Sequence, residues 1–246
     1  MSTINNDLVE KKINEILKKI DFENLKNNPK LLIIPCSHKK RADGTDFHER
    51  NYFNSEVYKY LNVARELRKY HYKEFINSNP DKFVMRKDIN GNGIEVQVDG
   101  NYFIDLINNN NNLFPAVERY DGEFYSYELR NLYFQKHRES NLHILIISGL
   151  YGVIEFKDEI TDYHFKINNG NGVNLWGNIL TNAINQYIAE NNIDNRNVFY
   201  ALSNEYLNKI NPNTQWNNLW INKIGKSRQA NLKYSADCVL KFLHKI

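Results

Sequence analysis

Residues 142–152 read Leu-His-Ile-Leu-Ile-Ile-Ser-Gly-Leu-Tyr-Gly, an apolar run that ends in a serine and two glycines. Two other short apolar runs also lead into a polar cluster with a serine, at residues 31–37 (Leu-Leu-Ile-Ile-Pro-Cys-Ser) and 198–206 (Val-Phe-Tyr-Ala-Leu-Ser-Asn-Glu-Tyr). Such runs are typical of strands buried on both faces, as in a parallel sheet covered by helices. The carboxyl ends of parallel strands share one edge, where ligands bind. The sequence therefore predicts that three distant polar clusters meet at one site.

The segments between these runs predict the helices that would cover such a sheet. Apolar stripes or helix-forming patterns occur at residues 7–20, 54–76, 125–138, 175–191 and 231–244. Residues 216–224 are expected to add an edge strand. Alternation of strands and helices favours right-handed βαβ crossovers. We therefore expect an α/β fold with a helix-flanked, mostly parallel sheet.

Residues 79–115 depart from this alternation. Short antiparallel strands are expected at 83–89, 94–98 and 102–106, because Asn90-Gly91 and Asp99-Gly100 are turn-forming pairs. Residues 88–99 also resemble a calcium-binding loop in the spacing of their oxygen-bearing side chains. Glu95, however, stands where an apolar residue is usual, so the hairpin is favoured. We expect residues 1–246 to form a single domain, with 79–115 as a β-hairpin insertion.

The composition limits the classes of protein that are possible. A chain of 246 residues with 41% hydrophobic residues can bury a full core, and a largely disordered protein is excluded. A net charge of +3 permits a nucleic-acid partner but does not require one. Cys36 and Cys238 form no CxxC pair, and the histidines show no HExxH pattern, so no metal or cofactor is expected.

Targeting signals are also not evident. No apolar stretch reaches the roughly 18 residues that a bilayer span needs, and the first residues lack a signal-peptide pattern. We therefore expect a protein of the cytoplasm that does not contact a membrane.

The first polar cluster, at residues 35–41, reads Pro-Cys-Ser-His-Lys-Lys-Arg. Backbone N–H groups in such a turn can hold a phosphate or a carboxylate, and the cations add charge complementarity. A thiol beside cations can also act as a nucleophile. Cys36 and Lys39 are therefore candidate nucleophiles, and Ser37 and Lys40 are candidate ligand-binding residues. The alternative is a buried thiol beside a solvated basic loop.

The second cluster follows the run that ends at residue 147. Glycine lets a ligand approach the backbone closely, and a tyrosine can stack on a base or a sugar. The candidate ligand-binding residues here are Ser148, Gly149, Tyr151, Gly152 and Tyr163. Asp158 is a candidate general acid or base.

The third cluster, at residues 203–206, offers both hydrogen-bond donors and acceptors. Ser203, Asn204 and Tyr206 are candidate ligand-binding residues, and Glu205 is a candidate general acid or base. Ser203 or Asn204 would also serve as an ordinary helix cap, and Glu205 would equally suit a solvated helix face.

Several of these segments, in the same order, resemble the YaaA family of peroxide stress proteins (UPF0246, DUF328). Residues 148–153 match the family's Ser-Gly-Leu-Tyr-Gly-Val motif. Weaker likenesses lie at 120–125 (Phe-Lys-Gly-Asp-Val-Tyr in the family), at Asp158 with Tyr163, at 175–179 (Phe-Trp-Gly-Asp-Ile) and at 202–206 (Leu-Ala-Ser-Asp-Glu-Tyr). Residues 34–39 depart from the family's Ile-Ser-Pro-Ala-Lys and are closer to the PCSxxK-type motif of the related DUF6884 group. The helix-hairpin-helix of the family is not evident between residues 69 and 112.

The resemblance implies a cytoplasmic, DNA-binding protein that limits oxidative damage, with a fold distantly similar to uracil-DNA glycosylases. In that case the basic loop, Tyr151 and Trp176 would line a groove for phosphate and base. The alternative is an enzyme acting on a nucleobase, nucleoside or nucleotide. Cys36 or Lys39 would be its nucleophile and Glu205 or Asp158 its acid or base. A third possibility is an interaction protein without chemistry.

Overall fold

The computed structural model of this chain describes residues 6–37, 39–41, 84–87, 94–97, 114–149, 151–160, 179–222 and 227–246. Its centre is a five-stranded sheet in the order β11-β10-β1-β7-β8. The strands are β1 (Lys30–Pro35), β7 (Leu142–Ser148), β8 (Gly152–Glu155), β10 (Val198–Tyr200) and β11 (Asn217–Asn218). All neighbours are parallel except β7 and β8, which form an antiparallel edge. The predicted mostly parallel α/β sheet is therefore confirmed.

The central strand β1 is buried along its whole length, as its unbroken apolar sequence predicts. It pairs with β7 in a register that sets Pro35 opposite Ile147, and with β10 in a register that sets Ile33 opposite Tyr200. The chain passes from β1 to β7 on one side and returns later to β10 on the other side. The carboxyl ends of β1 and β10 therefore flank the point where the strand order reverses, which is the usual ligand crevice of such sheets.

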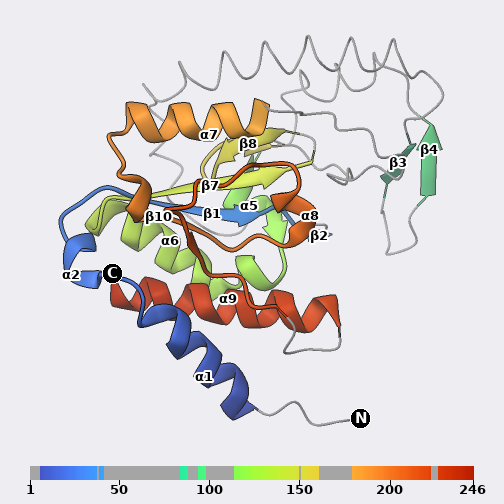
Figure 1. Cartoon of the computed structure of the whole chain (residues 1–246). Helices are drawn as coiled ribbons and strands as arrows, with labels where there is room; N and C mark the ends of the chain where they lie inside the picture. The colour runs from blue at the N-terminus through green and yellow to red at the C-terminus, as the bar shows by residue number, and fades with distance from the viewer. Residues whose placement is uncertain are drawn as a thin grey trace.

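Helices cover both faces of the sheet (Figure 1). Helix α7 (Ile179–Glu190) covers one face, and α6 (Tyr127–Glu139) with α9 (Arg228–Lys245) covers the other. Helix α1 (Asn6–Leu17) packs on α9 rather than on the sheet. These four correspond to expected helices, and the expected helix at 54–76 lies outside the described residues. Within the described part of the chain, no helix combines the length and the hydropathy of a membrane span.

Short elements connect this framework. They are α2 (Phe22–Leu25), β2 (Lys39–Lys40), β5 (Phe114–Pro115), α5 (Ala116–Arg119), β6 (Tyr120–Asp121), η2 (Glu123–Tyr125), β9 (Glu159–Ile160), η3 (Asn195–Asn197) and α8 (Asn204–Leu207). Two of their pairings are antiparallel, β2 with β6 and β5 with β9. The first of these pairings shapes the candidate site.

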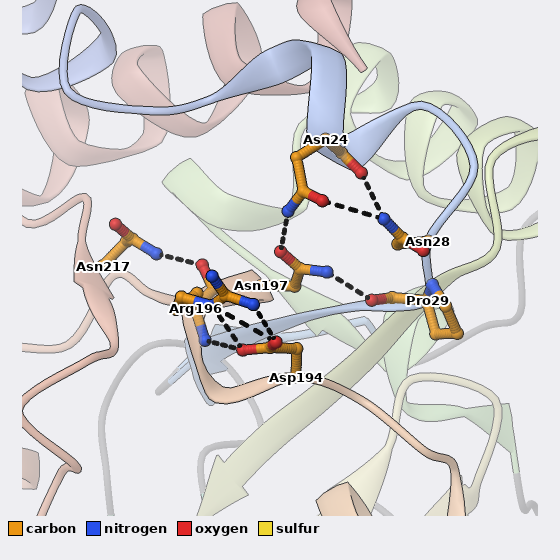
Figure 2. Close-up of polar contacts among 7 residues, drawn as sticks. All are labelled: Asn24, Asn28, Pro29, Asp194, Arg196, Asn197 and Asn217. Carbon is orange, nitrogen blue, oxygen red and sulfur yellow. Dashed lines mark hydrogen bonds and ion pairs between the residues drawn. The ribbon is translucent and has the colours of Figure 1, made fainter.

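The amino ends of β1 and β10 are joined by side-chain amides (Figure 2). Asn197 is 3% exposed, and its Oδ1 accepts a hydrogen bond from Asn24 Nδ2 at 3.0 Å. Its Nδ2 donates to the carbonyl of Pro29 at 3.3 Å. Nearby, Asn217 Nδ2 donates to the Arg196 carbonyl at 2.7 Å. The buried Asn197 amide, bonded at both ends, therefore joins η3 to α2 and to the start of β1, and the Asn217 amide joins β11 to η3.

The antiparallel strand pairing expected within residues 79–115 is observed. Strands β3 (Val84–Lys87) and β4 (Ile94–Gln97) pair antiparallel, with Lys87 opposite Ile94. The turn between them and the expected third strand at 102–106 lie outside the described residues. The extent of the insertion, 79–115, stays a prediction.

Candidate functional site

A cavity of about 520 Å³ opens at the carboxyl ends of β1 and β10. The lining comes from four parts of the chain: Pro35–Ser37 with Lys39 and Lys40 at the end of β1, Asp121–Tyr125 around η2, Ser203, Glu205 and Tyr206 after β10, and Trp220 with Arg228, Gln229 and Leu232 at the start of α9. They are far apart in the sequence and meet because β1 and β10 are parallel neighbours. The predicted convergence of the first and third polar clusters is therefore observed.

The half-buried Cys36 and the buried Tyr125 and Tyr206 supply polar groups to the lining. Cys36 Sγ lies 3.4 Å from the hydroxyl of Tyr206, which donates a longer hydrogen bond of 3.5 Å to the Cys36 carbonyl. The hydroxyl of Tyr125 donates to the Pro35 carbonyl at 2.7 Å. Burial raises the pKa of Tyr125 and of Tyr206 well above the usual range. Both phenols are therefore neutral at physiological pH and act as fixed hydrogen-bonding groups.

The basic loop is held by the β2–β6 ribbon. Lys39 pairs with Asp121, and Lys40 pairs with Tyr120. Ser37 Oγ donates to the Asp121 carbonyl and accepts from the Lys39 N–H at 3.2 Å. Lys40 Nζ donates to the Ser37 carbonyl at 3.2 Å and lies 5.5 Å from the centroid of the Tyr120 ring. Ser37, Lys39 and Lys40 are therefore held by the pairing with β6 and by the Ser37 and Lys40 side chains, and the exposed Lys39 lines the cavity.

The opposite wall carries an ion pair. Glu205 Oε2 lies 2.5 Å from Arg228 Nη2, which joins α8 to the start of α9. The Glu205 side chain is 26% exposed and that of Arg228 is 68% exposed, so the carboxylate is the more enclosed member. Ser203 occupies the N-cap position of α8, but its side chain makes no cap hydrogen bond. Its buried Oγ has no hydrogen-bond partner in the described structure.

The lining combines aromatic rings with balanced charge. Its rings come from Phe124, Tyr125, Tyr206 and Trp220. The charged lining residues that the structure describes are three cations and three carboxylates: Lys39, Lys40, Arg228, Asp121, Glu123 and Glu205. A cavity of this kind suits a flat ring with hydrogen-bonding edges better than it suits a polyanion.

The second polar cluster lies at the same edge of the sheet but does not line the cavity. The Cys36 N–H donates to the Ile147 carbonyl at 3.0 Å, so the two strand ends are adjacent. Ser148 is fully buried, and its Oγ accepts from the Tyr151 N–H at 3.0 Å inside the β7–β8 turn. Tyr151 is 6% exposed, and Gly152 has a φ of +72°. Gly149 is also buried in this turn.

Other predicted site residues also lie elsewhere. Asp158 is buried, and its Oδ2 accepts from the Glu155 N–H at 2.9 Å, which closes the turn after β8. Asn204 begins α8 and is not among the residues lining the cavity. Tyr163 and Trp176 lie outside the described residues. The roles of these four residues stay predictions.

The structure adds lining residues that the sequence did not single out as functional. Asp121, Glu123 and Tyr125 belong to the 120–125 segment, whose resemblance to a family motif was their only signal. Trp220 and Arg228 had no local signal, because only the fold brings the start of α9 to the strand ends. Among the described residues, no group of three or more His, Cys, Asp or Glu side chains is arranged to hold a metal ion.

Comparison with known proteins gives a family match and several partial relatives. A family model described as "Peroxide stress protein YaaA" matches residues 31–234. A UPF0246 protein of Rickettsia rickettsii is 41% identical over 75 residues, 29% of each chain. A UPF0246 protein of Rickettsia felis is 32% identical over 114 residues, 43% of this chain and 44% of the relative. One of Shewanella sp. (strain W3-18-1) is 33% identical over 103 residues, 39% of each chain.

The aligned stretches thus cover less than half the length of these curated relatives. The family model, in contrast, spans most of this chain and includes every described segment that lines the cavity, from Pro35 to Leu232. The chain belongs to the YaaA family of peroxide stress proteins.

Proposed function

We propose that this protein acts in the peroxide stress response by binding DNA, and that its cavity receives one base of a bound strand. Family membership supports the link to peroxide stress. The observation that carries the DNA-binding proposal is the cavity itself, which is large enough for a nucleotide and lined by four aromatic side chains. Bases taken out of a stack are held in this way, between apolar or aromatic walls and a polar edge.

The mouth of the cavity supplies contacts for the backbone of such a strand. Lys39 is exposed, and the side chain of Arg228 is 68% exposed although it forms the ion pair with Glu205. Cations in these positions can neutralise phosphates that flank an inserted base. The proposal also places the protein in the cytoplasm, where thiols stay reduced, because Cys36 and Cys238 are both free.

The test is the affinity of the purified full chain for short single-stranded DNA, measured by fluorescence anisotropy at several salt concentrations. We expect affinity to fall steeply with salt, because binding releases counterions. Lys39→Gln should weaken binding and reduce the salt slope by about 1. Lys19→Gln, an exposed lysine after α1, is the matched control and should leave both unchanged. Absence of binding at low salt, or affinity that is flat with salt, would contradict the proposal.

A second candidate function is an enzyme acting on a nucleobase, nucleoside or nucleotide. One observation favours it: Cys36, Lys39 and Glu205, the candidate nucleophiles and acid or base, all line the same cavity. Turnover found in a screen of such compounds should be abolished by Cys36→Ala and by Glu205→Gln without a lower melting temperature. Unchanged turnover in both variants would exclude Cys36 as the nucleophile and Glu205 as the acid or base.

A further inference from the structure

The part of the cavity wall formed by Ser203, α8 and the start of α9 carries several hydrogen-bonding groups. Arg228 Nη2 donates to Glu205 Oε2, and in the described structure no hydrogen bond is made to the other carboxylate oxygen, Oε1. Both residues line the cavity together with Ser203. A ligand in the cavity therefore meets guanidinium N–H donors next to a carboxylate with free acceptor capacity.

The Glu205 carboxylate and the Arg228 guanidinium together can distinguish among the bases. Guanine carries two adjacent donors, N1–H and N2–H, beside one acceptor, O6, so a carboxylate can accept both donors while a neighbouring guanidinium donates to O6. Adenine and cytosine offer one amino donor beside a ring nitrogen whose lone pair would face the second carboxylate oxygen. Uracil and thymine offer a single N–H between two carbonyl groups, and the second carboxylate oxygen would face one of those carbonyls.

We propose that the cavity recognises guanine, with the Glu205 carboxylate accepting N1–H and N2–H and the Arg228 guanidinium donating to O6. This inference rests on the proposed function, in which the cavity holds a base. Ser203, whose Oγ has no hydrogen-bond partner in the described structure, lines the same wall. The rings of Tyr206 and Trp220 supply apolar surface for the purine, and about 520 Å³ is within the usual range for small-molecule sites.

Calorimetric titration of the full chain with guanosine, inosine, adenosine and cytidine tests the assignment. Guanosine should bind tightest. Inosine, which lacks the N2 amino group, should be several-fold weaker, and adenosine and cytidine at least roughly tenfold weaker. Glu205→Gln, which replaces one acceptor oxygen by a donor, should remove the preference for guanosine while the melting temperature is kept. Glu190→Gln, an exposed carboxylate at the end of α7, is the matched control.

Equal affinity for guanosine and adenosine, or an unchanged preference in Glu205→Gln, would overturn the assignment. Single-stranded oligothymidylate, with and without one central guanine, separates this inference from the DNA-binding proposal. Equal binding of both strands keeps the DNA-binding proposal and overturns the guanine assignment. Binding of guanosine, sensitive to Glu205→Gln, with no binding of either strand keeps the assignment and overturns DNA binding. Failure of every ligand overturns both.

Discussion

Gly122 shows how one residue sets the shape of the cavity. Its φ is +133°, a conformation that side chains other than glycine rarely adopt, and an added Cβ would lie 2.9 Å from Ser37 Oγ. That serine holds the β2–β6 ribbon through its bond to the Asp121 carbonyl. The glycine is therefore needed both for its backbone conformation and for the close approach of the basic loop.

We expect Gly122→Ala to lower the free energy of unfolding by roughly 1–3 kcal/mol, because the strained φ and the contact with Ser37 both oppose the alanine. Urea denaturation measures the loss. In the double variant Ser37→Ala with Gly122→Ala, part of the loss should return, since the nearest atom has been removed. A Gly122→Ala variant as stable as the wild type would show that the loop adjusts freely, contrary to this account.

At the scale of elements, β7, β8 and α7 are joined by a chain of partly buried polar contacts. The hydroxyl of Tyr187 on α7 donates to Glu155 Oε1 at 2.5 Å, and His143 Nδ1 on β7 lies 2.9 Å from the same hydroxyl. The pKa of His143 is lowered to about 4, mainly by burial and in addition by the charges of His137 and Lys30. Burial also raises the pKa of Glu155, against the effect of the Tyr187 bond.

The lowered pKa of His143 predicts that the protein loses stability in mild acid. Between pH 6.5 and about 4, His143 is protonated in the unfolded chain but stays neutral in the native protein. The free energy of unfolding therefore falls as the pH falls. The wild type should lose up to about 3 kcal/mol more than His143→Gln over this range. Denaturant unfolding at several pH values measures the difference, and Glu155, present in both proteins, largely cancels from it. Parallel loss in both proteins would exclude His143 as the cause.

The elements also show what the sequence can predict. The runs at residues 31–34, 143–147 and 198–200 form strands as expected, because short unbroken apolar segments are typical of strands buried on both faces. The antiparallel pairing of β8 was not expected, since Gly152–Glu155 is too short to show an alternating pattern. Strand β8 pairs with β7 because the chain reverses directly after Ser148, whose Oγ accepts a hydrogen bond from the Tyr151 N–H.

For the whole molecule, predicting the site depended on the order of the strands. Cys36, Ser37, Lys39 and Lys40 meet Ser203, Glu205 and Tyr206 because β1 and β10 are parallel neighbours. The glycine–tyrosine turn was expected to face the same ligand, but the antiparallel return of β8 buries Tyr151. Arg228 could not be predicted, because no local pattern shows that the start of α9 reaches the strand ends.

The central claim is that these segments form one ligand site, and the two free cysteines offer a direct test. Cys36 lines the cavity and is half-buried, whereas Cys238 is fully buried within α9 and serves as an internal control. The measurement is the rate of iodoacetamide labelling at each cysteine, followed by mass spectrometry with and without saturating guanine-containing single-stranded DNA. We predict that Cys36 is labelled and that the DNA slows its labelling at least roughly tenfold, while Cys238 stays unlabelled in both conditions. Cys36 labelling at the same rate with and without bound DNA would contradict the account.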